Sequence, residues 1–271
     1  MTIEYQEIKK KHLVKKSILN AAYKSTETHV GSALSCAEIM EAIYFQVANI
    51  NKNNCNDESR DRIILSKGHA ALAQYACLML KDIMPQKVFD TYNLDGGFLP
   101  AHLDLESSDG IEVSTGMSLG HGIGLAEGFA LANRLKKINA RIFVIIGDGE
   151  LQEGSIWEGL NSVIDLNIKE ITIIIDKNNM QASAETKNIT DNTKLNAVFK
   201  EMGFDVKTTN GHDVDAITQV LKVNSDRPLL IIANTIKGHG LPKQFENTIK
   251  SHYVKLTPEE FQFAINNLED K

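Results

Sequence analysis

The sequence predicts an α/β fold in which one domain of three layers, residues 1–271, is built around a mostly parallel sheet. Two observations lead to this prediction. Continuous apolar, β-branched runs alternate with helical segments in the second half of the chain, which is typical of parallel strands buried on both faces. Two consecutive runs also end in glycine and oxygen-bearing residues, at the end of the strand where such sheets bind ligands. No internal repeat or Pro/Gly-rich linker divides the chain.

The first half of the chain predicts helices and one short strand. Apolar residues at helical spacing predict an N-terminal helix, and they are Ile8, Val14, Ile18 and Ala22. A second helix is expected over residues 35–47, with Ser35 as N-cap and Glu38 completing a capping box. An apolar run over residues 62–65 predicts a strand, and an Ala/Leu-rich segment over residues 70–80 predicts a helix. Polar or Gly-containing composition predicts loops over residues 51–61 and 94–110.

The second half of the chain has a regular alternation of strands and helices. Apolar runs predict four strands, over residues 141–146, 170–175, 204–208 and 229–233. Helical spacing predicts helices over residues 157–166 and 214–223, and a polar segment spans residues 182–193. Such alternation indicates strand–helix–strand units, and therefore a parallel sheet.

Composition excludes several classes of function. The chain has 29 Lys and Arg against 35 Asp and Glu, a net charge of −6 without a basic block, which argues against nucleic-acid binding. Its apolar runs, such as residues 142–146 and 171–175, are far shorter than a membrane span, and the charged N-terminus does not resemble a secretory signal. Cys36, Cys55 and Cys77 are odd in number and have no paired spacing, which predicts reduced thiols in a cytoplasm.

Oxygen-bearing side chains follow two consecutive predicted strands. Gly147-Asp148-Gly149 follows the first, and Asn178-Asn179 follows the second. Asp148 and Asn178 offer hard oxygen ligands, which suit Mg²⁺ or Ca²⁺, and the glycines allow a phosphate to approach the backbone. Each motif alone is common in ordinary turns. Residues 150–177 between them accommodate one helix and one strand, which places both motifs at the same edge of the sheet.

The pair of motifs resembles the thiamine diphosphate fingerprint, and the segment GDGELQEGSIWEGLNSVIDLNIKEITIIIDKNNMQ resembles the diphosphate-binding (PP) domain of transketolases. Four other segments resemble that family in the family's order, and they are HVGSALS (29–35), LSKGHA (65–70), LPAH (99–102) and GIEVSTG (110–116). The resemblance covers almost the whole chain. It implies the thiamine diphosphate-binding fold.

The resemblance also implies site residues. Mg²⁺, for which Ca²⁺ can substitute, is implied at Asp148, Asn178 and the Met180 carbonyl. The implied cofactor contacts are His69, Gly116, Leu119, Gly149, Glu150, Asn178 and His252, and the implied catalytic residues are His29, His69, His102 and His252. Histidine suits this chemistry, because protons must move on and off sugar oxygens near neutral pH.

Other motifs carry different expectations. The segment Thr115–Gly120 is one residue longer than the family pattern. The backbone contacts implied for Gly116 and Leu119 can therefore fall on a neighbouring residue. Gly120–Gly124 lacks the spacing of a dinucleotide loop, which argues against an NAD site. His212 is predicted to be a structural turn residue, and His12 to be solvated on a helix.

Chains of that family also carry a pyrimidine-binding domain and a C-terminal domain, and no segment of residues 1–271 resembles either. The resemblance therefore implies the N-terminal subunit of a split transketolase, which transfers a two-carbon ketol unit between sugar phosphates in a heterotetramer with two copies of each chain. Two alternatives stay open: the α chain of a thiamine diphosphate-dependent 2-oxo-acid dehydrogenase, and a non-catalytic regulatory paralogue. The segments of His29, His69 and His102 favour a transketolase.

Overall fold

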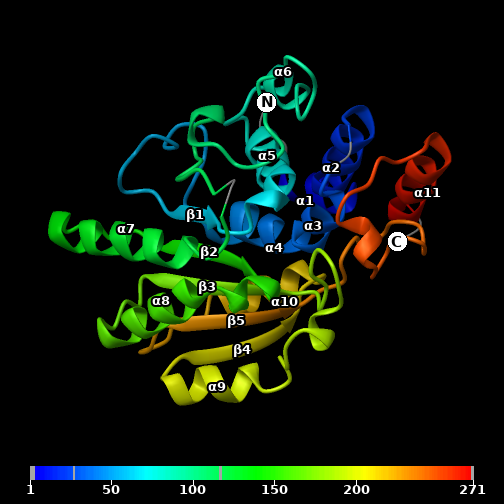
Figure 1. The fold of residues 1–271 in the computed structure, drawn as a ribbon. Helices are drawn as coiled ribbons and strands as arrows, with labels where there is room; N and C mark the ends of the chain where they lie inside the picture. Colours follow the sequence, from blue (N-terminus) through cyan, green and yellow to red (C-terminus); the bar gives the residue numbers. More distant parts are fainter. Residues whose placement is uncertain (1–3, 27, 116–117, 270–271) are drawn as a thin grey trace.

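The computed structural model describes residues 4–26, 28–115 and 118–269. Within them, five strands form one sheet in the order β1-β2-β3-β5-β4, and all neighbouring strands run parallel (Figure 1). The strands are β1 (Arg62–Leu65), β2 (Ile142–Gly147), β3 (Ile171–Lys177), β4 (Asp205–Asn210) and β5 (Leu229–Asn234). Each lies within two residues of a predicted strand, so the prediction of a parallel α/β sheet is confirmed.

Helices cover both faces of the sheet. One face packs against α2 (Leu13–Lys24), α3 (Val30–Ser35), α4 (Ala37–Ala42), α5 (Ala71–Leu80) and α10 (Val214–Leu221), and the other against α7 (Gly122–Lys136), α8 (Gly154–Asp165) and α9 (Leu195–Met202). Figure 1 shows the N-terminal helices, in blue and cyan, on the opposite side of the sheet from α8 and α9. Alternate residues of β2 point to opposite faces of the sheet. Phe143 packs in the hydrophobic core on the first face and Val144 in the core on the second. The predicted three-layer arrangement is confirmed.

The predicted helix over residues 35–47 is wrong in its start and in its continuity. Ser35 ends α3 instead of capping a helix, Cys36 separates α3 from α4, and a π-helical turn over Ile43–Val47 follows. The Ser35 hydroxyl donates to the Asp176 carboxylate at 2.8 Å. The side chain that the capping motif requires is therefore hydrogen-bonded to a residue distant in sequence instead of to the start of a helix.

The N-terminal helix is interrupted. α1 (Tyr5–Lys10) ends before His12, whose φ of 49° lies in the left-handed region, and α2 begins at Leu13. His12 is half-buried at this break, so the prediction of a solvated helical residue is wrong.

Besides α3, four helices of the described residues were not predicted from the sequence. They are α6 (Gln86–Phe89), α7, α9 and α11 (Pro258–Glu269). α7 escapes prediction because its first turns contain Gly122, Gly124 and Gly128, and glycine lowers helix propensity. Its buried side, with Ile123, nevertheless packs against the sheet. In the part of the chain that the structure describes, no helix combines the length and the apolar character needed to cross a bilayer.

Candidate active site

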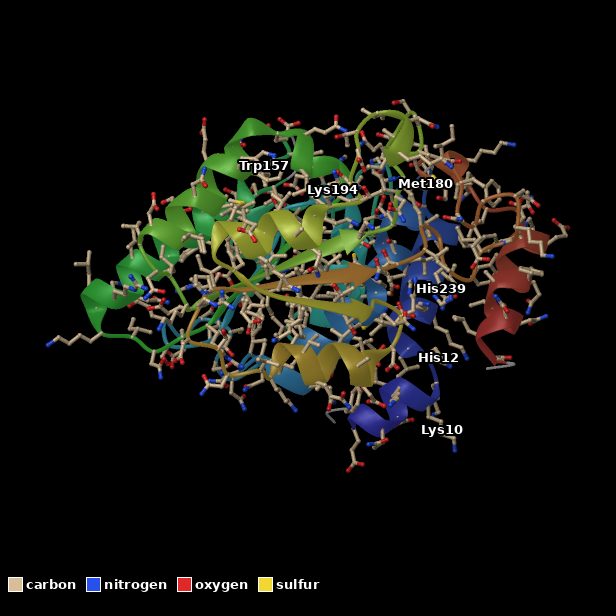
Figure 2. All side chains as sticks on the ribbon, turned by 90° about the horizontal axis from the view of Figure 1, so that it is seen from below. Lys10, His12, Trp157, Met180, Lys194 and His239 are labelled. Carbon is tan, nitrogen blue, oxygen red and sulfur yellow. The ribbon has the colours of Figure 1, made fainter. Side chains whose placement is uncertain are left out.

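The carboxyl ends of four parallel strands meet at one edge of the sheet. Asp148 follows β2 and Asn178 follows β3, while Lys67 follows β1 and Lys237 follows β5. A cavity of about 410 Å³ lies at this edge, and all four residues line it. Met180, which also lines the cavity, lies at the end of the sheet toward which the strand arrows point (Figure 2). The predicted meeting of the two motifs at one edge is confirmed.

Asp148 is a buried carboxylate, 1% exposed, held by the loop after β3. Its Oδ2 accepts from the Asn179 N–H at 2.9 Å and from the Thr186 hydroxyl at 3.1 Å. Burial and the nearby Asp176 charge raise the pKa of Asp148 to about 6. A cation beside this carboxylate stabilises its charged form, so the environment fits a metal ligand.

The orientation of the Asn178 amide follows from its neighbours. Its Nδ2 donates to the Ser35 hydroxyl at 3.1 Å and lies 3.4 Å from Asp176 Oδ2. Because a carboxylate only accepts hydrogen bonds, the amide nitrogen must face Asp176. Asn178 Oδ1 therefore points the other way, where it accepts from the Met180 N–H at 3.0 Å. Asp148 and Asn178 thus supply oxygen donors from adjacent strands.

Four histidines from four separate segments meet in the cavity. The ring centroid of His29 lies 5.4 Å from His69, 5.1 Å from His102 and 4.8 Å from His252. Burial lowers the pKa of all four, to about 3 for His29 and about 4 for His252. At neutral pH these rings are uncharged, and each offers one hydrogen-bond donor and one hydrogen-bond acceptor nitrogen. The structure brings together all four histidines that the resemblance singled out.

His29 presents an unused nitrogen to the cavity. Its Nδ1 lies 3.0 Å from the His252 carbonyl oxygen, and since a carbonyl only accepts, Nδ1 carries the proton. His29 Nε2 is then a bare acceptor, and it is buried without a partner in the described structure. The Ser32 hydroxyl and Gln181 Nε2 are likewise buried and unpartnered, and both residues line the same cavity. Buried polar atoms rarely remain unpaired, so these three indicate a polar ligand.

Two buried lysines add positive charge to the cavity. Lys67 forms an ion pair with Asp176, and Lys237 Nζ lies 3.2 Å from His252 Nδ1 and 3.4 Å from the Gln181 carbonyl. Burial and the Lys67 charge lower the pKa of Lys237 to about 8. An anionic group in the cavity stabilises the charged form of Lys237, which burial disfavours. Sequence reasoning missed both lysines, although each stands in a segment that also carries a histidine, SKGH and KGHG.

Three of the four remaining predicted cofactor contacts lie at the cavity. Leu119, Gly149 and Glu150 line the cavity, and Gly116 lies outside the described residues. The Glu150 carboxylate accepts from the Ser66 hydroxyl, from the Gly120 N–H at 2.8 Å and from the Gly147 N–H at 3.1 Å. Through these bonds Glu150 holds the loop after β2 against the segments after β1 and before α7.

A family model, transketolase, thiamine diphosphate binding domain, matches residues 10–268. The chain belongs to the transketolase family. A 6-deoxy-6-sulfo-D-fructose transketolase subunit of Clostridium sp. (strain MSTE9) is 36% identical over 95% of this chain and 94% of the relative. An apulose-4-phosphate transketolase subunit of Actinobacillus succinogenes is 32% identical over 99% of this chain and 98% of the relative.

Solved transketolases share the fold. The transketolase of Campylobacter jejuni superposes with a TM-score of 0.86 at 26% identity, covering 96% of this chain and 42% of that one. This chain matches these relatives over nearly their full length and has the thiamine diphosphate-binding domain of the family.

A second polar cluster in this member of the transketolase family lies outside the cavity. It contains Lys15, Glu38, His212 and His239, and the two imidazole rings lie 3.8 Å apart. His212 Nε2 accepts from the Ile236 N–H at 2.7 Å, so its Nδ1 carries the proton and donates to Glu38 at 3.1 Å. Both ring nitrogens are thereby used, which leaves none for a metal. The prediction that His212 is a structural turn residue is confirmed.

Proposed function

We propose that this chain binds thiamine diphosphate through Mg²⁺ and, with a second subunit, transfers a two-carbon ketol unit from a ketose to an aldose. The observation that carries the proposal is the single cavity in which Asp148 and Asn178 meet four neutral histidines. One end of this cavity offers oxygen ligands, and the other offers groups that can move protons. The family supports the cofactor, and the residues fit it.

The metal and diphosphate belong, in this proposal, at the ends of β2 and β3. Asp148, Asn178 and the Met180 carbonyl hold Mg²⁺, and Ca²⁺ can replace it because the donors are all oxygens. Gly149 donates its backbone N–H to the diphosphate. The other proposed cofactor contacts are His69, Gly116, Leu119, Glu150 and His252.

The histidines handle the protons. Thiamine diphosphate, when bound, supplies an electron sink for breaking the carbon–carbon bond beside a ketose carbonyl. His29 Nε2, a bare acceptor, takes a hydrogen bond or a proton from a hydroxyl of the ketol unit. The rings of His102 and His252 lie beside His29 and are neutral at rest, so each can relay a proton by accepting one at its bare nitrogen and releasing one from its N–H.

The proposed substrates are sugars with an anionic terminal group. Relatives are named for a sulfonated ketose and for a sugar phosphate, so the class includes both phosphate and sulfonate. The pentose phosphates are one set within this class. The two other classes considered from sequence, a 2-oxo-acid dehydrogenase chain and a non-catalytic paralogue, gain no support from these relatives.

The proposed assembly is a heterotetramer with two copies of each chain, in which the partner carries the pyrimidine-binding and C-terminal domains. Relatives of full matching length are named as subunits, which supports a partner. The outer side of α7 is an exposed apolar face of Gly124, Gly128, Leu131 and Leu135, the last 87% exposed. Such a face is typical of a protein interface. The three buried, free cysteines fit a cytoplasmic location.

The test uses this chain together with its partner subunit. Calorimetry is expected to show thiamine diphosphate binding that depends on Mg²⁺, and the assembled enzyme is expected to transfer a ketol unit from xylulose 5-phosphate to ribose 5-phosphate. Asp148→Ala is expected to abolish the Mg²⁺ dependence of binding. Full cofactor affinity in Asp148→Ala contradicts the metal assignment, and decarboxylation of pyruvate without sugar transfer contradicts the reaction.

The assembly is tested separately. Leu135→Glu places a charge in the α7 face and is expected to shift the complex toward smaller species in sedimentation velocity. Lys136→Glu, at the neighbouring and also exposed position, is the matched control. An unchanged mass for Leu135→Glu contradicts a contact through α7.

A further inference from the structure

Tyr253 is an exposed aromatic residue at the mouth of the cavity. It lines the cavity, yet it is 57% exposed, whereas the histidines behind it are buried or half-buried. Its ring centroid lies 4.2 Å from that of His29, with the planes tilted by 44°, and 5.2 Å from that of His252. Tyr253 therefore covers the outer side of the histidine cluster.

The backbone around Tyr253 is held on both sides. Before it, the His252 carbonyl accepts from His29 Nδ1 at 3.0 Å. After it, Val254 and Thr28 exchange two backbone hydrogen bonds of 3.1 Å, which tie the segment to the residue preceding His29. Because both neighbours are fixed to the His29 segment, the Tyr253 ring is held over His29 and is not free to swing away with a loop.

The direction of the substrate follows from these positions. The ketol unit must lie at the inner end of the cavity, where His29 Nε2 is buried and unpartnered. The rest of the sugar, which leaves as one aldose and is replaced by another, must then extend toward the mouth. Tyr253 is the aromatic side chain that the sugar meets there.

We propose that Tyr253 selects the aldose portion of the sugar, an inference that rests on the function proposed above. Its ring face packs against the carbon-bound hydrogens of the aldose chain, and its hydroxyl can donate to or accept from a sugar hydroxyl. A tyrosine ring offers no positive charge for the terminal phosphate or sulfonate. Tyr253 therefore discriminates chain length and hydroxyl pattern, while the terminal anion is bound by other groups.

The test measures kcat and KM of the enzyme assembled with its partner for a series of acceptors. Glycolaldehyde adds only two carbons beyond the ketol unit and so reaches least far toward the mouth, whereas erythrose 4-phosphate and ribose 5-phosphate extend further toward it. Tyr253→Ala is expected to lower kcat/KM about tenfold for the two long acceptors, mainly through KM, and to leave glycolaldehyde unchanged. Tyr253→Phe keeps the ring and is expected to retain most of the preference for long acceptors.

Two controls separate specificity from structure. Phe263→Ala removes an aromatic side chain that is 50% exposed on α11, away from the cavity, and is expected to change no acceptor's kcat/KM. Calorimetric affinity for thiamine diphosphate with Mg²⁺ is expected to be the same in Tyr253→Ala and the unmodified chain.

Three outcomes overturn the inference. An equal loss of kcat for all acceptors means that Tyr253 only supports His29. Loss of the complex with the partner in sedimentation means that Tyr253 is an interface residue. An unmodified complex that binds the cofactor but uses no sugar overturns the proposed function, and this inference with it; that result is recognised because it does not involve the Tyr253 variants.

Discussion

Lys67 and Asp176 form an ion pair beneath the cavity, and they are 1% and 0% exposed. Burial alone favours the neutral form of Asp176, but the Lys67 ammonium holds the pKa of this carboxyl below its usual value. The same carboxylate accepts from the hydroxyls of Ser35 and Thr235 and faces the Asn178 amide. The pair thus joins the segment after β1 to the end of β3 and fixes the amide that presents an oxygen to the proposed metal.

Asp176→Asn is expected to lower the free energy of unfolding by about 3–5 kcal/mol, because it leaves the Lys67 charge buried without a carboxylate. An asparagine can also donate to Asn178, so the amide is no longer fixed, and we expect Mg²⁺-dependent cofactor affinity to fall about 10–100-fold. Urea unfolding and calorimetry measure the two effects.

The control for this prediction is Asp215→Asn. It removes a carboxylate from the exposed pair of Lys9 and Asp215, 2.6 Å apart, and should cost less than about 1 kcal/mol. The double variant Lys67→Met with Asp176→Leu removes both buried charges and is expected to recover most of the stability but not the metal affinity. Recovery of both would show that the pair only stabilises the fold.

His29→Ala is expected to reduce kcat of the assembled enzyme by about 10²–10⁴-fold, because it removes the bare Nε2 acceptor at the inner end of the cavity. Cofactor affinity, measured by calorimetry, should change little. His121→Ala removes an exposed histidine that precedes α7 and serves as the control. A His29→Ala enzyme with unchanged kcat would contradict a role in proton transfer.

Gly31→Ala is expected to destabilise the site, since a Cβ at this position collides with the carbonyl and side chain of Ser251. The Gly31 carbonyl also accepts from the Gly238 N–H at 2.9 Å, so Gly31 lies between the segments that carry His252 and Lys237. We expect a lower melting temperature and weaker cofactor binding. Gly128→Ala meets no atom within 4 Å and should raise the melting temperature of the isolated chain. Equal effects of the two substitutions would contradict this packing argument.

Glu41 is expected to make stability depend on pH. Burial and the neighbouring Glu38 raise its pKa to about 7, against the opposing charges of Lys15 and Lys9. Between the unfolded value of about 4.5 and this folded value, the native state binds more protons, so stability falls as pH rises through this window. Relative to the unmodified chain, the free energy of unfolding of Glu41→Gln, measured with urea, should rise by on the order of 3 kcal/mol between pH 4 and pH 8. Glu201→Gln, at an exposed position, is the matched control, and a difference for Glu41→Gln that does not change with pH would refute the raised pKa.

Much of the fold could be predicted from local patterns. The strands were found because buried parallel strands are continuous apolar runs, as Ile171–Ile175 illustrates. α7 was missed because its glycines weaken the helical signal, and its formation depends on packing against the sheet. The predicted N-cap at Ser35 is wrong because the Ser35 hydroxyl donates to the carboxylate of Asp176, which is distant in sequence.

The sequence by itself determined the parallel sheet and the meeting of Asp148 with Asn178 at one edge, because both depend on local spacing and on the parallel direction of adjacent strands. The family followed from the resemblance of whole segments. Only the tertiary structure decided the rest of the site. Lys67 and Asp176 are 109 residues apart, and His29 and His252 are 223 apart, so no local pattern pairs them. Which nitrogen carries a proton, how the Asn178 amide is turned, and where Tyr253 stands all follow from partners that only folding brings within reach.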